Sequence, residues 1–182
     1  MMPADARSLA SAYLRIVRVL SRISGAVAAG LIALGVVVIC EMVVERYVLG
    51  RTTIWQIDVV TYSIVAAAFI GSAYVLMTRG HVNVDVLPLH LAPRARFRLA
   101  LLTTTVAMVF CIVLCVLAII YWHEAWAANW RSNTVWRARL WIPYSAMPIG
   151  LVLLVLEYLA EMIRLVTGRT QPYGLEPKRL LE

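Results

Sequence analysis

The sequence predicts an all-α membrane protein with four transmembrane helices, organised as a single domain over residues 1–182. Four stretches carry no charged side chain: Ile23–Cys40, Val59–Thr78, Leu99–Trp122 and Leu140–Leu156. They hold 17 to 24 residues each, and about 20 apolar residues in a helix cross the hydrocarbon core of a bilayer. Since unpaired backbone groups are costly in hydrocarbon, spans of this length are expected to be helical. Apolar residues make up 62% of the chain, which leaves little sequence for a separate water-soluble catalytic domain.

The distribution of arginine and lysine predicts the orientation. The spans are predicted at about residues 23–44, 55–78, 97–124 and 141–165. Of the 17 basic residues, 12 lie at the amino-terminal end, around the connection between the second and third spans, or at the carboxyl-terminal end. Because cytoplasmic segments carry the excess of basic residues, both termini are predicted in the cytoplasm. The net charge of +7 is therefore assigned to contact with anionic inner-leaflet lipids and not to nucleic-acid binding.

The residues before the first span repeat apolar side chains at helical spacing, interrupted by arginines. The apolar positions are Leu9, Tyr13, Ile16, Val17 and Leu20. A basic amphipathic helix of this kind lies on a membrane surface, so this segment is predicted on the inner surface. The apolar run that follows is longer than a signal-peptide core, and the first span is expected to act as an uncleaved signal anchor.

Small side chains repeat at helical spacing on the first two spans. They are Ala26, Gly30 and Ala33 on the first span, and Ser63, Ala67 and Gly71 on the second. In lipid, helices associate through small side chains that let their backbones approach. Two interpretations stay open: these faces close the four-helix bundle, or they meet another protein.

The connection from Arg79 to Arg98 is too apolar for a plain solvated loop. His81, Asn83 and Asp85 alternate there with valines. Pro88 and Pro93 limit any long helix in this connection. The sequence predicts a short segment at the inner interface.

All six tryptophans lie at span ends assigned to the outer side: Trp55, Trp122, Trp126, Trp130, Trp136 and Trp141. Indole favours the headgroup level, so they predict an outer aromatic belt that anchors the protein in the membrane. The dense stretch from Trp122 to Trp141 is also a candidate docking surface.

The fourth span contains two prolines. Pro143 falls where a helix begins, so its missing N–H costs no hydrogen bond there, whereas Pro148 is expected to bend the helix.

Acidic residues in the spans are candidates for function, since a charge at the centre of a membrane helix costs about 3 kcal/mol or more. Glu41, Glu45 and Asp58 lie near the outer interface. Glu157 is the deepest acid and is followed by Glu161 and Arg164 on neighbouring turns. Two interpretations are open for Glu157: pairing near the inner headgroups, or contact with a partner helix or a buried polar network.

No cofactor, metal site or enzymatic motif is predicted. A membrane haem needs imidazoles on facing helices, but the histidines lie in the inner connection or at the outer end of the third span: His81, His90 and His123. The cysteines lie in spans and are expected to be small buried hydrophobic residues: Cys40, Cys111 and Cys115. No zinc, P-loop or hydrolase pattern occurs, so the chain is not predicted to be an enzyme.

One further set of residues follows a pattern along the second span. The positions are Arg46, Tyr47, Trp55, Asp58, Gly71, Arg79, His81, Asp85 and Pro93. In this order and spacing, and with the fourth-span segment LWIPYSAMPIG from Leu140 to Gly150, the chain resembles the small membrane subunit of tripartite ATP-independent periplasmic (TRAP) transporters, the DctQ-like family. Many members carry two adjacent acids after the tryptophan, whereas here Gln56 and Ile57 precede a single acid.

The resemblance implies a small, non-catalytic subunit of a secondary-active transporter in the bacterial inner membrane. It implies a large permease subunit that carries the solute and sodium sites, and a periplasmic binding protein that delivers the solute. The small subunit would support the scaffold while the large subunit's transport domain moves. The candidate contacts with the large subunit are Ser63, Ala67, Gly71, Asp58 and Glu157, and the candidate docking residues for the binding protein are Glu45, Arg51, Arg131 and Arg137.

Three other classes of small membrane protein remain as alternatives. The small subunit of a tripartite tricarboxylate transporter also has four spans, and the stretch from Arg79 to Asp85 argues for the TRAP family instead. An autonomous exporter requires an acidic residue in the middle of a span, for which Glu157 is the one candidate. A membrane redox subunit requires paired histidines within the membrane-spanning helices.

Overall fold

The computed structural model describes residues 4–78 and 93–167, with side chains from residues 9 and 94 onward in the two ranges. Its helices are α1 (Ala4–Tyr47), α2 (Gln56–Met77), α4 (Pro93–Ala127), α5 (Trp141–Tyr144) and α6 (Ala146–Val166). Over these ranges the one strand-like pairing is an isolated bridge between Arg131 and Arg139. Helices α1, α2 and α4 are each long and apolar enough to cross a membrane. The prediction of an all-α membrane protein is confirmed.

The helix bounds follow the predicted spans closely, except at the amino-terminal end. The second span is α2, the third lies within α4, and residues 141–165 are covered by α5 and α6 together. Pro93 is the first residue of α4, where its missing N–H leaves no helical hydrogen bond unmade. The predicted interfacial segment around His81 and Asp85 lies outside the described residues.

The amino-terminal segment differs from its prediction. It is not a separate surface helix but the first part of α1, which runs unbroken for 44 residues. Leu14 and Val17 are buried against Ala160 of α6, and the Tyr13 hydroxyl donates to the Leu156 carbonyl at 2.8 Å. No glycine or proline interrupts residues 4–24, so the helix continues. Of the predicted apolar positions, Tyr13 and Val17 pack on α6, whereas Leu9, Ile16 and Leu20 are exposed.

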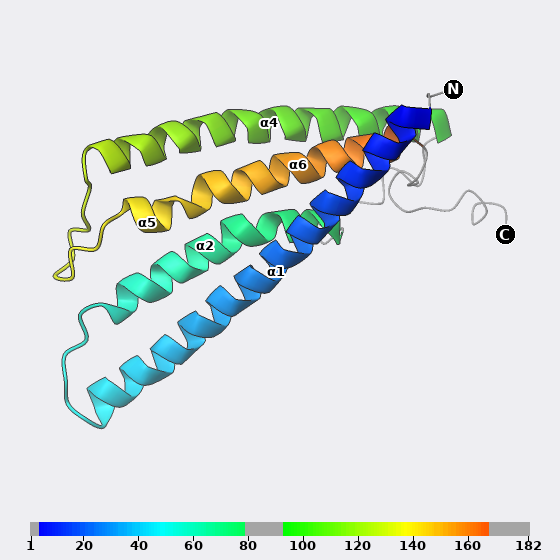
Figure 1. Ribbon diagram of the computed structural model, residues 1–182. Coiled ribbons are helices and arrows are strands. Elements are labelled where there is room, and N and C mark those ends of the chain that lie inside the picture. The colour runs from blue at the N-terminus through cyan, green and yellow to red at the C-terminus, as the bar shows by residue number, and fades with distance from the viewer. Residues whose placement is uncertain (1–3, 79–92, 168–182) are drawn as a thin grey trace.

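The helices form an open layer and not a closed four-helix bundle. Helix α6 contacts α1, α2 and α4, and α2 packs along α1. Between α4 and either α1 or α2, the described residues make no extensive contact. Figure 1 shows the resulting fan, with α4, α6, α2 and α1 in spatial order and α1 crossing toward α6 at its amino-terminal end.

Helix α1 packs through one narrow seam. Its buried positions alternate by three and four residues, with one step of seven: Leu14, Val17, Ser21, Ser24, Ala28, Gly35 and Val38. Hydrophobic positions repeating every 3.5 residues are typical of helices that pack at a shallow left-handed angle. Most of the seam consists of small side chains, which allow neighbouring backbones to approach in lipid.

The two small-residue faces have different fates. On α2, Ser63, Ala67 and Gly71 are buried within the chain, and a Cβ added at Gly71 would lie 3.0 Å from the Cβ of Ala28. On α1, the face formed by Ala26, Gly30 and Ala33 is exposed. The α2 face therefore closes contacts within this chain, whereas the α1 face does not.

Two helices approach each other closely at Gly150. A Cβ built there would lie 2.4 Å from the carbonyl carbon and oxygen of Phe69. Because real Cβ atoms do not come so near a backbone, only glycine allows α6 to rest on α2 at this distance.

The helix of the fourth predicted span is interrupted shortly before Pro148, the residue at which the sequence predicts a bend. Helix α5 ends at Tyr144 and α6 begins at Ala146. Pro148 has no N–H for the Tyr144 carbonyl, and its ring crowds that carbonyl. Ser145, between the helices, donates through Oγ to the Ile142 carbonyl at 2.6 Å.

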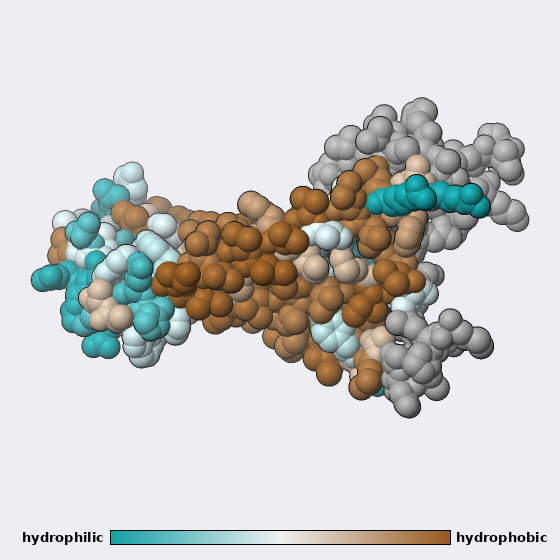
Figure 2. Space-filling view, turned by 90° about the horizontal axis from the view of Figure 1, so that it is seen from above, coloured by the Kyte–Doolittle hydropathy of each residue, from teal (hydrophilic) through white to brown (hydrophobic). Residues whose placement is uncertain are grey.

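Much of the surface is apolar. In the most apolar window of each candidate span, only 17% of the residues are buried. Figure 2 shows a broad apolar band along the middle of the molecule, with polar residues gathered at the end that carries the α1–α2 and α4–α5 connections. Such a band is what a surface in contact with lipid or with another membrane protein requires.

Candidate functional site

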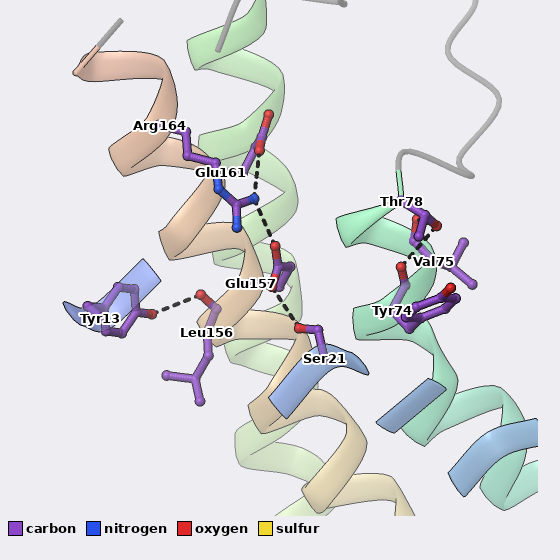
Figure 3. A network of polar contacts seen from close by, with 9 residues as sticks. All are labelled: Tyr13, Ser21, Tyr74, Val75, Thr78, Leu156, Glu157, Glu161 and Arg164. Carbon is purple, nitrogen blue, oxygen red and sulfur yellow. Dashed lines mark hydrogen bonds and ion pairs between the residues drawn. The ribbon is translucent and has the colours of Figure 1, made fainter. Parts of the chain in front are cut away.

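Glu157 is the centre of a polar network between α1 and α6. Its side chain is fully buried. Oε2 accepts a hydrogen bond from the Ser21 hydroxyl at 2.7 Å, and Oε1 accepts one from Nη1 of Arg164 at 2.9 Å (Figure 3). Both carboxylate oxygens are therefore paired inside the protein.

Arg164 is shared by two carboxylates. The same Nη1 atom lies 3.2 Å from Oε2 of Glu161, one turn away on α6. Figure 3 shows this group beside the Tyr13–Leu156 hydrogen bond. A buried charge is tolerated when it is paired and hydrogen-bonded. The structure therefore shows Glu157 both paired with Arg164 and buried in a polar network with Ser21.

A second network joins α1 to the start of α2. The Gln56 side chain is 2% exposed, and its Nε2 donates to Oε2 of Glu45 at 2.8 Å and lies 3.5 Å from Oε1 of Glu41. Its Oε1 accepts a hydrogen bond from the Ile54 N–H at 3.1 Å. An amide supplies the donor that two neighbouring carboxylates need, and a carboxylate at position 56 would supply none.

Gln56 is the functional-site residue that reasoning from the sequence missed. Its partner carboxylates lie 11 and 15 residues earlier, on another helix, so spacing along α2 gives no sign of them. The available signal was the departure from the two-acid pattern, since Gln56 and Ile57 precede a single acid in this chain.

Asp58 ties α2 to the connection between α4 and α5. It is 9% exposed and accepts a hydrogen bond from the hydroxyl of Thr134. It also lies in the first turn of α2, where a negative charge is favourable to the helix dipole. This residue was expected at a partner interface, and the structure places it in a contact within the chain.

The other predicted contacts with the large subunit are also internal. Ser63 and Ala67 are 6% exposed and Glu157 is fully buried, while Gly71 packs on Ala28. These side chains are covered by helices of the same chain, because α1 and α6 occupy the faces that the small residues open.

Tryptophans of the predicted aromatic belt gather at the end with the α4–α5 connection. Trp126 packs on Trp141 with ring centroids 4.5 Å apart and on Trp122 at 5.7 Å. Nε1 of Trp122 donates to the Trp141 carbonyl at 3.0 Å, and Trp130 meets Tyr121 edge to face at 5.5 Å. This part of the predicted belt therefore fastens α4 to α5.

Three of the four predicted docking residues are exposed. Arg51, Arg131 and Arg137 lie on the surface, whereas Glu45 is half-buried and bonded by Gln56. The connection that carries two of these arginines is held as a hairpin, with Ser132 N–H donating to the Ala138 carbonyl at 2.9 Å and Leu140 N–H to the Trp130 carbonyl at 3.0 Å.

No metal-binding group of histidine, cysteine, aspartate and glutamate occurs in the part of the chain that the structure describes. Cys111 and Cys115 are buried, as predicted, but Cys40 is exposed. Cys40 lies outside the packing seam of α1, on the face that no other described helix covers.

Comparison with known proteins places these features in a family. The family model of the DctQ component of tripartite ATP-independent periplasmic transporters matches residues 35–168. The C4-dicarboxylate TRAP transporter small permease protein DctQ of Vibrio cholerae serotype O1 is 29% identical in an alignment of 122 residues, gaps included, that covers 55% of this chain and 52% of that relative. The chain thus spans about half the length of the relative that it matches. No solved structure matches. Since the family model covers well over half of the sequence, the chain belongs to the DctQ component family of tripartite ATP-independent periplasmic transporters.

Proposed function

We propose that this chain is the small, non-catalytic membrane subunit of a secondary-active TRAP transporter, which supports a large permease during ion-coupled, sodium-driven uptake of a solute. The observation that carries the proposal is family membership, which makes the chain a transporter subunit. The described residues add two networks with paired carboxylates. Their role here is to hold helices together.

The proposal includes four crossings of the bacterial inner membrane with both termini in the cytoplasm. Helices α1, α2 and α4 are three of the crossings, and α5 with the 21-residue α6 is the fourth. The end with the tryptophans and the two connections then faces the periplasm. The excess of arginine and lysine in the two terminal segments and around the connection between the second and third spans supports this orientation.

The open layer supports association with a large permease. Helix α4 contacts α6 through one face and leaves most of its apolar side chains exposed, among them Val106, Val109, Phe110, Val113 and Leu117. Since such a surface is stable against lipid or against another membrane protein, it is available to the large subunit. The exposed Ala26–Gly30–Ala33 face of α1 is a second surface on which a helix can approach closely.

The polar end supports docking of a periplasmic binding protein. Arg51, Arg131 and Arg137 are exposed there, and the hairpin fixes the backbone of the last two. Charged groups on a fixed surface steer a partner of complementary charge. In this proposal the solute reaches the large subunit from that partner, and the small subunit contributes no substrate site.

Uptake in proteoliposomes tests the proposal. Vesicles are prepared with the large permease alone, with this chain alone, and with both, and the binding protein is supplied outside with labelled solute and a sodium gradient. Uptake is expected only where both membrane proteins are present. Transport by this chain alone would instead identify an autonomous transporter, and full uptake by the permease alone would remove the supporting role.

A further inference from the structure

An apolar groove opens beside three arginines at the polar end of the molecule. Its volume is about 470 Å³, within the range of about 300–1,000 Å³ that is typical of ligand sites. Leu31 of α1 and Val59 and Ala66 of α2 form its walls, with Ile142 of α5. Arg131, Arg137 and Arg139 from the α4–α5 connection also line it.

The three arginines are held together without an acidic partner. None of them forms an ion pair with any residue in the described ranges. The bridge between Arg131 and Arg139 sets two of them side by side. The backbone of Arg137 has φ +51°. Residues other than glycine rarely adopt this left-handed conformation, and those that do occur preferentially at functional sites. The three side chains are exposed, and a cluster of positive charges attracts an anion.

The shape of the groove indicates what that anion belongs to. Along α2 the groove runs from Val59 to Ala66, a distance of about 10 Å at 1.5 Å per residue. That length lies within one leaflet, whose hydrocarbon is about 15 Å deep. Trp136 lines the groove beside the arginines and is 44% exposed, as expected of an indole at the headgroup level.

We propose that this groove binds a phospholipid with an anionic headgroup. One acyl chain lies against the α1–α2–α5 walls, and the phosphate meets the guanidinium groups of Arg131, Arg137 and Arg139. Guanidinium donates paired hydrogen bonds to phosphate. A zwitterionic lipid also has a phosphate, but the positive charge of its own headgroup lies nearby and opposes the arginines. A partner helix in the groove would have to bring its own acid to this depth. The lipid brings a phosphate there by its nature.

Native mass spectrometry of the purified full chain, with any proteins that accompany it, tests the proposal. The sample is exchanged into equal amounts of phosphatidylglycerol and phosphatidylcholine with the same acyl chains. The wild type is expected to retain phosphatidylglycerol about tenfold over phosphatidylcholine, a difference of about 1.4 kcal/mol. Equal retention of the two lipids overturns the proposal without any variant.

Two variants separate the headgroup from the acyl chain. Replacing Arg131, Arg137 and Arg139 together by glutamine is expected to remove the preference, whereas Arg46→Gln with Arg51→Gln, at the same end but outside the groove, keeps it. Ala66→Leu fills the groove at constant charge and is expected to lower retention of both lipids. If Ala66→Leu retains phosphatidylglycerol fully, the lipid is bound at the surface and the groove is not its site. Displacement of the lipid when the large permease is added would assign the groove to a partner helix.

Discussion

At the scale of single residues, the molecule is held by two amino acids that satisfy polar groups inside an apolar chain. Glu157 is the acceptor for Ser21 and Arg164, and Gln56 is the donor for Glu45 and Glu41. The sequence predicted the grouping of Glu157 with Glu161 and Arg164, because the three lie on neighbouring turns of one helix. It did not predict Ser21, which is 136 residues away, because contacts between helices leave no trace in local spacing.

The Glu157–Arg164 pair makes a prediction at this scale. Arg164→Leu leaves a buried carboxylate without its cation and is expected to lower stability by about 3–5 kcal/mol. Replacing Glu157 by leucine as well is expected to restore most of the loss, because the fully buried carboxylate is then gone, and Glu161, which also loses Arg164, is only partly buried. The measurement is unfolding in mixed detergent micelles. Ser21→Ala is the milder comparison, with an expected loss of about 1.5–3 kcal/mol. A double variant as unstable as Arg164→Leu contradicts this account.

Gln56 makes a second prediction. Gln56→Glu keeps the size of the side chain but sets a third carboxylate against Glu41 and Glu45, so the thermal midpoint of the purified protein is expected to fall. Glu45→Gln added to this variant exchanges donor and acceptor across the same contact. We expect the exchange to recover the midpoint. Failure of the exchange, with Gln56→Glu itself destabilising, would mean that packing around position 56 matters and the hydrogen bond does not.

At the scale of elements, apolar runs predict where the helices lie but not which faces they use. The bounds of α2 follow from the sequence, because hydrophobic length acts locally, and the break between α5 and α6 lies close to the proline at which a bend is predicted. The continuation of α1 through its arginines did not follow, since the burial of Leu14 and Val17 depends on Ala160 of α6. The small-residue faces of α1 (Ala26, Gly30, Ala33) and α2 (Ser63, Ala67, Gly71) have the same spacing in the sequence, yet only the α2 face is buried.

Two helical glycines give a matched prediction at this scale. Gly150→Ala places a Cβ against the backbone of Phe69 and is expected to cost about 1–3 kcal/mol through the helix shift that it forces. Gly30→Ala meets nothing within 4 Å and is expected to leave stability unchanged or raise it by up to about 1 kcal/mol. Both are compared by thermal unfolding in the same detergent. Equal effects at the two sites would contradict the close approach of α6 to α2.

At the scale of the whole molecule, the open layer is the feature that the sequence did not predict. Four apolar spans are compatible with a closed bundle, and the choice depends on which pairs of faces fit. Here α6 packs against α1, α2 and α4. Because α4 packs along α6 and not along α1 or α2, it keeps a broad exposed apolar surface. A chain built in this way is suited to being one part of a larger membrane assembly.

Docking of the binding protein makes a prediction at this scale. Arg131→Glu with Arg137→Glu is expected to lower uptake severalfold in proteoliposomes that contain both membrane proteins, because association steered by charge depends on these groups. Arg15→Glu, an exposed arginine near the other end of the molecule, is the control and is expected to leave uptake unchanged. Unchanged uptake and binding-protein affinity in the double variant would remove this docking surface.

The most direct test of the central claim is a pull-down of the tagged chain from its native membranes in mild detergent, with mass spectrometry of the proteins that accompany it. The account predicts a large multi-span permease in an amount equal to that of the chain. Recovery of the chain alone, or only as its own oligomer, would contradict its role as a transporter subunit.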